Sequence, residues 1–168
     1  MSDNKPEPIV ANIMRQGTPF VTPDTPVPAV AKLLVDLDIA GVPVVENDNI
    51  VGIVTEADVI GRQVIIDPPA VLPFLDAIFT FDAGPDYEDG VRRALAITAR
   101  DLMTEPVINI KSSATLTEVA TVIMDRKVNP VPVLDENLNY VGLVSRRDLV
   151  VVISALENAR DGDEQTVS

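Results

Sequence analysis

The chain has no cysteine, no histidine and no tryptophan. Without cysteine it can form no disulfide and perform no thiol catalysis. Without histidine it lacks the commonest metal ligand and the usual general base at neutral pH. The sequence also contains no nucleophile–base pair, Walker loop or ordered set of metal ligands. We therefore expect a protein that is not an enzyme and holds no catalytic cofactor or metal.

Basic residues are scarce: 13 lysines and arginines stand against 26 acidic residues, a net charge of −13 over 168 residues. Such a surface repels phosphate backbones and anionic lipids, so nucleic acids and membranes are disfavoured as partners. The longest strongly apolar run, residues 149–153, is far too short to span a bilayer. Because the N-terminus is polar, we do not expect it to be a signal peptide. Because 46% of the residues are hydrophobic, we predict a folded protein, and we expect it in the cytoplasm.

The chain contains one unit written twice. VGIVTEAD at residues 51–58 and VGLVSRRD at 141–148 are both a short apolar strand that runs into a Ser/Thr-x-x-Asp corner. VPVV at 42–45 and VPVL at 131–134 precede them. The offset is 89 residues for the Pro strands (131 − 42) and 90 for the corners (141 − 51). The extra residue falls in the turn at 135–139, where a hairpin tolerates an insertion.

Each copy predicts the order β-α-β-β-α. In the first copy we predict a strand at 20–21, a helix that begins at Thr25 and ends at Gly41, and a second helix capped by Thr55. In the second copy, the first strand is expected at 107–110, and Thr115 with Glu118 forms a capping box. The predicted boundaries are a loose tail at 1–10, repeat 1 at 11–60, an insertion at 61–98, repeat 2 at 99–156 and a fraying tail at 157–168.

The insertion differs in character from both repeats. Its apolar part, residues 70–81, holds Phe74, Phe79 and Phe81, and Asp86 is placed to cap a helix that follows. We interpret the insertion as a helical hairpin. Its aromatic side chains form either a satellite core or an oligomer surface, and the enrichment of aromatics at interfaces slightly favours the surface.

The doubled β-α-β-β-α unit, with a Val-Pro-Val strand, a Gly-x-Val-Ser/Thr-x-x-Asp corner and Met14 or Met103 at its start, resembles the cystathionine β-synthase (CBS) domain pair. The resemblance covers both repeats and leaves out the insertion. It implies an α+β fold in which the repeats pack with pseudo-twofold symmetry around two clefts, and it implies a flat homodimer. Many such pairs bind AMP, ADP, ATP or S-adenosylmethionine and regulate a partner protein instead of catalysing a reaction.

The resemblance assigns the corner carboxylates, Asp58 and Asp148, to the ribose hydroxyls. The hydroxyls of Thr55 and Ser145 help to position the ribose or the phosphate. An ionised carboxylate only accepts hydrogen bonds and therefore suits a diol, and the helix that follows each corner favours phosphate at its N-terminus. Each corner is expected to face the Pro strand of the other repeat. The Asp148 cleft would then contain Ser145, Arg146, Arg147, Met14, Pro19, Gly41, Val42 and Pro43. The Asp58 cleft would contain Thr55, Met103, Ile108, Asn129, Pro130 and Val131. The apolar slots for the base would be shaped by Gly41, Val42, Ile53 and Leu143.

The two corners differ in charge, because Arg146 and Arg147 stand where the first corner has Glu56 and Ala57. Guanidinium groups bind phosphate and a glutamate repels it, so we expect the Asp148 cleft to take a phosphorylated nucleotide first. Three alternatives remain open. The corners are simple helix caps, the two arginines are solvated surface charges, or the fold serves as a ligand-free scaffold.

Overall fold

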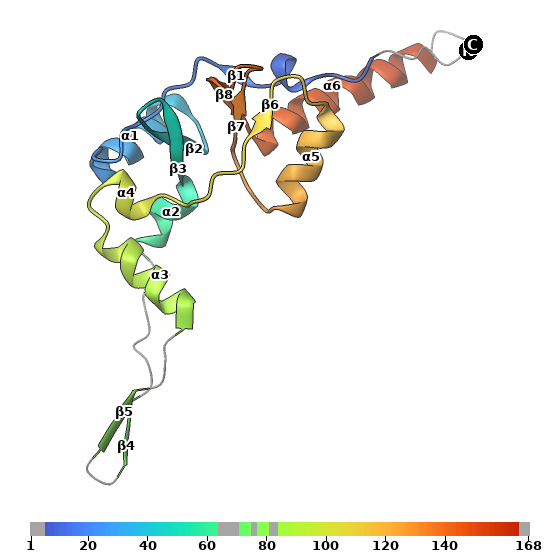
Figure 1. Ribbon diagram of the computed structural model, residues 1–168. Coiled ribbons are helices and arrows are strands. Elements are labelled where there is room, and N and C mark those ends of the chain that lie inside the picture. Colours follow the sequence, from blue (N-terminus) through green and yellow to red (C-terminus); the bar gives the residue numbers. More distant parts are fainter. Residues whose placement is uncertain (1–5, 64–70, 75–76, 81–83, 165–168) are drawn as a thin grey trace. The chain divides into compact units, whose positions relative to one another are not determined.

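The computed structural model describes residues 6–63, 71–74, 77–80 and 84–164 (Figure 1). The chain divides into two compact units. The repeat-1 unit is Val21–Glu105, and the repeat-2 unit is Met1–Phe20 together with Pro106–Ser168. Both units combine helices with strands, so the predicted α+β class is confirmed. The pseudo-twofold packing of the repeats stays a prediction.

The repeat-1 unit is built on the hairpin of β2 (Gly41–Glu46) and β3 (Asn49–Thr55), with α1 (Val27–Leu37) before it and α2 (Glu56–Gly61) after it. Single bridges extend the hairpin on both sides: Val21 lies parallel to Val44, and Thr104 lies antiparallel to Ile53. The unit also contains α3 (Gly84–Leu95) and α4 (Ala99–Leu102). Its core includes Val30, Leu34, Val42, Val44, Val54, Ala99 and Leu102.

The repeat-2 unit has a four-stranded sheet in the order β1 (Arg15–Gln16), β8 (Tyr140–Val144), β7 (Val131–Leu134) and β6 (Ile110–Lys111). Strands β1 and β7 run antiparallel to β8, and β6 runs parallel to β7. A 3₁₀ turn, η1 (Val10–Asn12), and the helices α5 (Leu116–Asp125) and α6 (Arg146–Glu164) complete the unit. Its core includes Val10, Ile13, Val119, Ile123, Val131, Val133 and Val144.

The segments that lead into the repeats are exchanged. We call residues 10–16 and 99–105 the lead-in segments, which correspond at the offset of 89. The first lead-in belongs to the repeat-2 unit, and the second belongs to the repeat-1 unit. Each lies along the strand that ends in a corner, as Arg15 faces Leu143 of β8 and Thr104 faces Ile53 of β3. The compact units therefore do not coincide with the sequence repeats.

Two glycines at equivalent positions permit this close approach. A Cβ atom on Gly142 would lie 2.3 Å from the carbonyl oxygen of Arg15, and a Cβ atom on Gly52 would lie 2.3 Å from the sulfur of Met103. A glycine inside a strand commonly marks a place where another segment approaches the backbone. Here that segment is the lead-in of the other repeat.

The boundaries predicted for the first helix were wrong at both ends. Helix α1 begins at Val27, not at Thr25, and ends at Leu37 because Asp38 adopts a left-handed conformation with φ of 49°. Gly41 instead opens β2. The first strand of each repeat is also shorter than predicted: the first is the single bridge at Val21, and the second is β6 alone.

The predicted loose tails are in part ordered. Val10 is fully buried, and Oε1 of Glu7 accepts a hydrogen bond of 2.7 Å from the backbone N–H of Thr117. At the other end, α6 continues to Glu164, well beyond the predicted end at residue 156. None of the helices that the structure describes is long and apolar enough to cross a membrane.

The insertion is only half helical. Strands β4 (Val71–Phe74) and β5 (Ala77–Thr80) form an antiparallel hairpin, and α3 follows from Gly84, two residues before the expected cap. The predicted helical hairpin was therefore wrong at residues 71–74 and 77–80, and the β-branched and aromatic residues of these segments account for the strands. Phe81 lies outside the described residues, and the aromatic interface stays a prediction.

Candidate functional site

Both corners are helix caps that use a single carboxylate oxygen. Oδ2 of Asp148 accepts hydrogen bonds from the N–H and the hydroxyl of Ser145, at 2.8 and 2.6 Å. Oδ2 of Asp58 accepts from the N–H and the hydroxyl of Thr55, at 2.9 and 2.7 Å. The hydroxyl of each cap accepts in return from the backbone N–H of its aspartate, at 3.3 Å. The capping interpretation is thus confirmed, but it leaves Oδ1 of each aspartate outside the cap.

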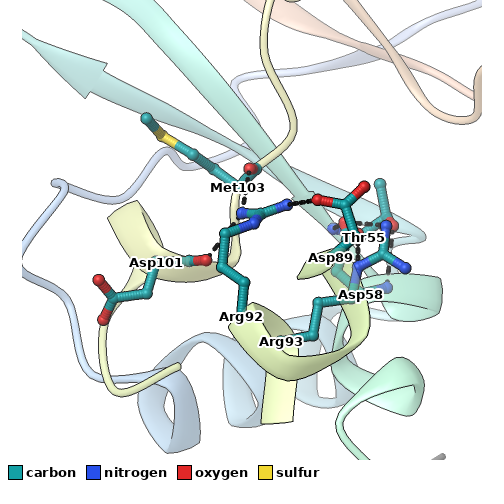
Figure 2. Close-up of polar contacts among 7 residues, drawn as sticks. All are labelled: Thr55, Asp58, Asp89, Arg92, Arg93, Asp101 and Met103. Carbon is teal, nitrogen blue, oxygen red and sulfur yellow. Dashed lines mark hydrogen bonds and ion pairs between the residues drawn. The ribbon is translucent and has the colours of Figure 1, made fainter. Parts of the chain in front are cut away.

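An arginine faces each of these Oδ1 atoms. Nε of Arg15 lies 3.5 Å from Oδ1 of Asp148, and Nε of Arg93 lies 3.8 Å from Oδ1 of Asp58 (Figure 2). Sequence reasoning missed both arginines. Arg15 directly follows Met14, a predicted site residue, and this neighbourhood could have marked it. The equivalent position in the second lead-in is Thr104 (15 + 89), so the repeat does not mark an arginine there. Arg93 comes from α3 of the insertion, where no repeat marks its position.

The corner carboxylates are largely withdrawn from water. Asp58 is 4% exposed, and the side chain of Asp148 is 13% exposed. A desolvated carboxylate needs hydrogen bonds and an opposite charge, and in each corner the cap supplies the first and the arginine the second. Each corner therefore presents an acceptor oxygen beside a guanidinium group.

Helix α3 is attached to the second lead-in by Arg92. Its guanidinium group donates to the carbonyl oxygens of Asp101 and Met103, at 2.8 and 3.4 Å, and pairs with Asp89 at 3.4 Å (Figure 2). The backbone N–H groups of Thr98 and then Ile97 hold the pKa of Asp101 below its usual range. A cavity of about 530 Å³ lies in this region, lined by Asp89, Arg92, Arg93, Arg100, Asp101, Met103, Thr104 and Glu105.

Both repeats match a known family. The CBS domain matches residues 10–64 and residues 99–155. The chain belongs to the CBS-domain family. The uncharacterised protein MJ1426 of Methanocaldococcus jannaschii is 32% identical over 120 residues, which are 67% of this chain and 71% of that protein.

Two further CBS proteins show the same fold. The chloroplastic protein CBSX2 of Arabidopsis thaliana is 25% identical over 157 residues, and the match covers 90% of this chain and 64% of that protein. The structure of CBSX2 in complex with AMP superimposes with a TM-score of 0.69 at 21% identity, covering 89% of this chain and 98% of that one. The CBS pair of MJ0100 was solved in complex with 5′-methylthioadenosine and S-adenosylmethionine. It superimposes with a TM-score of 0.62 at 20% identity, covering 89% of this chain and 98% of that one.

The predicted site residues of the two CBS repeats are only partly brought together. Met14 packs against the core of the repeat-2 unit, which also contains Pro19, Leu143 and the Asp148 corner. Ile53 and Met103 are buried in the repeat-1 unit with the Asp58 corner. Gly41, Val42 and Pro43 belong to the repeat-1 unit, whereas Asp148 belongs to the repeat-2 unit. Conversely, the repeat-2 unit contains Ile108, Asn129, Pro130 and Val131, whereas Asp58 belongs to the repeat-1 unit. The places of these residues in the clefts therefore stay predictions.

Asn129 has a role that the sequence did not suggest. Its side-chain oxygen accepts a hydrogen bond of 2.8 Å from the backbone N–H of Arg146, inside the second corner. At the equivalent place in the first repeat, the carbonyl oxygen of Ala40 accepts from the N–H of Glu56 at 3.0 Å. The side chain of Asn129 is thus tied to the Asp148 corner, where Arg146 and Arg147 are exposed at the start of α6.

Proposed function

We propose that this CBS pair is a regulatory module that binds an adenosine nucleotide (AMP, ADP or ATP) at its two corners and reports nucleotide status to a partner protein. One observation carries the proposal: in both repeats the corner aspartate keeps Oδ1 outside the cap, where it can accept a hydrogen bond from a ribose hydroxyl. The AMP of CBSX2 and the two adenosine compounds of MJ0100 support this ligand class. S-adenosylmethionine is the alternative ligand.

The Asp148 corner is the better site for a phosphorylated ligand. It opens α6, a helix of 19 residues, whose N-terminus favours an anion. Arg146 and Arg147 are exposed there, and Arg15 lies on the carboxylate. The Asp58 corner combines one arginine, Arg93, with the exposed Glu56. We therefore expect the Asp148 corner to fill first when the nucleotide carries phosphate.

Calorimetry on single variants tests this proposal. Wild type, Asp148→Ala and Asp58→Ala are titrated with AMP, ADP, ATP and S-adenosylmethionine. Asp125→Ala serves as a control, because it removes an exposed carboxylate of the repeat-2 unit. Losing a hydrogen bond to a charged group costs about 1.5–3 kcal/mol, which is roughly a 10- to 150-fold loss of affinity.

The expected pattern is loss of the tight phase in Asp148→Ala and its retention in Asp58→Ala and Asp125→Ala. The reverse pattern, or two equivalent sites, would refute the filling order. A wild-type protein that binds none of the four compounds would refute the proposed function and favour a ligand-free scaffold. Ligand-induced thermal stabilisation distinguishes these cases independently, since a ligand that binds only the native state raises the melting temperature.

The proposed module is a homodimer. Large apolar side chains are exposed at equivalent helix positions of the two repeats: Val35 and Met124 are 79% and 67% exposed, and Ile60 and Val150 are 67% and 65% exposed. Their positions differ by 89 and 90 residues, as those of the repeats do. Contiguous exposed apolar patches mark interaction surfaces, and the recurrence of these positions in both repeats supports such a surface.

A further inference from the structure

Arg93, like Arg62, carries a donor atom without a hydrogen-bond partner among the described residues. Its Nε atom is buried and makes no hydrogen bond with any residue that the structure describes. The 3.8 Å that separate Nε from Oδ1 of Asp58 are too long for a direct hydrogen bond. Buried N–H groups in folded proteins nearly always have a partner. Among the described residues this donor therefore has no hydrogen-bond partner, and it lies beside a carboxylate oxygen that the cap does not use.

The insertion holds Arg93 in this place. Arg92 attaches α3 to the carbonyl groups at the end of α4. Gly61, at the end of α2, leaves room for the stem of Arg93, because a Cβ atom there would lie 3.3 Å from Cδ of Arg93. Residue 93 lies outside both stretches that match the CBS domain, which end at residue 64 and resume at residue 99. The arrangement is therefore a property of this insertion.

We propose that Arg93 is a specificity-determining residue of the Asp58 corner, whose Nε–H donates a hydrogen bond to the same sugar hydroxyl that donates to Oδ1 of Asp58. A hydroxyl group is both donor and acceptor, so one oxygen satisfies both side chains. An oxygen about 2.7 Å from Oδ1 and about 2.9 Å from Nε has ordinary hydrogen-bond lengths, and the observed separation of 3.8 Å is short enough for one oxygen to meet both atoms. Because Nε is buried in the free chain, the side chain of Arg93, which is 35% exposed, must turn for that oxygen to enter.

Charge also favours a hydroxyl over a phosphate as the group held between these side chains. Asp58 and Arg93 form a neutral pair, and the neighbouring Glu56 is exposed and acidic. A phosphate between them would face the carboxylate directly, whereas a neutral hydroxyl meets an acceptor and a donor. The inference rests on the proposed function only in that the Asp58 corner takes a ribose.

The test uses adenosine and 2′,3′-dideoxyadenosine as probes in the full chain carrying Asp148→Ala, which leaves the Asp58 corner as the remaining site. In this background Arg93→Met is compared with Lys32→Met, which removes an exposed cation of the same unit that pairs with Asp36 and does not line the cavity beside Arg93. Calorimetry is expected to show that Arg93→Met lowers the affinity for adenosine by about tenfold, the effect of one charge-assisted hydrogen bond. Affinity for the dideoxy compound, which lacks the 2′ and 3′ hydroxyls, is expected to stay unchanged, as are both affinities in Lys32→Met. Circular dichroism confirms that each variant is folded.

Four results would overturn the inference. An equal loss for both probes would make Arg93 a structural residue, and tighter adenosine binding by Arg93→Met would make it an obstruction. AMP is titrated as a third probe, and a loss confined to AMP would make Arg93 a phosphate contact. Adenosine binding by wild type but not by the Asp148→Ala background would show that the Asp58 corner takes no nucleoside. If wild type itself binds no adenosine compound, the proposed function fails as well, so the two failures are distinguishable.

Discussion

The substitution Gly142→Ala tests how the first lead-in segment is held. Gly142 lies in β8 opposite Gln16 of β1. A Cβ atom at this position would lie 2.3 Å from the carbonyl oxygen of Arg15, 3.1 Å from its carbonyl carbon and 3.2 Å from Cα of Gln16. Unbonded heavy atoms are most stable at roughly 3.5 Å or more. All three neighbours are backbone atoms, so no side-chain rotation can relieve the overlap, and β1 must move away by about 1 Å.

The magnitude follows from what β1 carries. The lead-in brings Val10 and Ile13 into the core of the repeat-2 unit, and a shift of its strand disturbs that packing. Overpacking of this kind costs about 1–3 kcal/mol. For a protein of this size, each kcal/mol lowers the melting temperature by roughly 2–4 °C, so Gly142→Ala is expected to melt about 2–12 °C below wild type. Arg15 would move with the strand, away from Oδ1 of Asp148.

Gly52→Ala is the matched control in the other repeat. The three atoms nearest to its Cβ atom belong to the side chain of Met103, at 2.3 Å for the sulfur, 2.6 Å for Cγ and 2.8 Å for Cβ. Rotation of the flexible methionine side chain relieves the contacts with the sulfur and Cγ, and the contact with Cβ needs only a small backbone shift. We therefore expect a smaller loss of stability than for Gly142→Ala. Thermal melts followed by circular dichroism measure both variants. The reasoning is wrong if Gly142→Ala melts with wild type or if Gly52→Ala is the less stable of the two.

Two further predictions concern pH and assembly. Burial raises the pKa of Tyr140 to about 12 from 10.0, although a hydrogen bond of 2.6 Å with Thr18 opposes the shift. Because the unfolded chain loses this proton first, Tyr140 leaves stability unchanged below about pH 10 and lowers it as the pH rises toward 12. In urea titrations over that range, the free energy of unfolding of wild type should therefore fall relative to that of Tyr140→Phe. A constant difference between the two proteins would contradict the assignment. For assembly, Met124→Asp combined with Val150→Asp should convert a dimer to a folded monomer in sedimentation velocity, and a wild-type monomer at high micromolar concentration would reject the homodimer.

The local features of this protein could be predicted from its sequence. The corner caps join residues three apart, Thr55 with Asp58 and Ser145 with Asp148, so their hydrogen bonds depend only on the strand-to-helix transition. The hairpin of β7 and β8 follows from two apolar strands around a short turn. Because the pattern occurs twice in one order, the sequence alone determined the repeated unit, the family and the aspartates of the candidate site.

The exchange of the lead-in segments and the arginine beside each carboxylate were decided only in the tertiary structure. Arg15 and Asp148 lie near opposite ends of the chain, and Arg93 contacts Asp58 from a helix of the insertion. A lead-in of a few apolar residues fits the core of either repeat equally well by pattern, because the two repeats are alike. Which repeat it joins depends on the path of the chain, and that path decides which guanidinium group lies on each carboxylate.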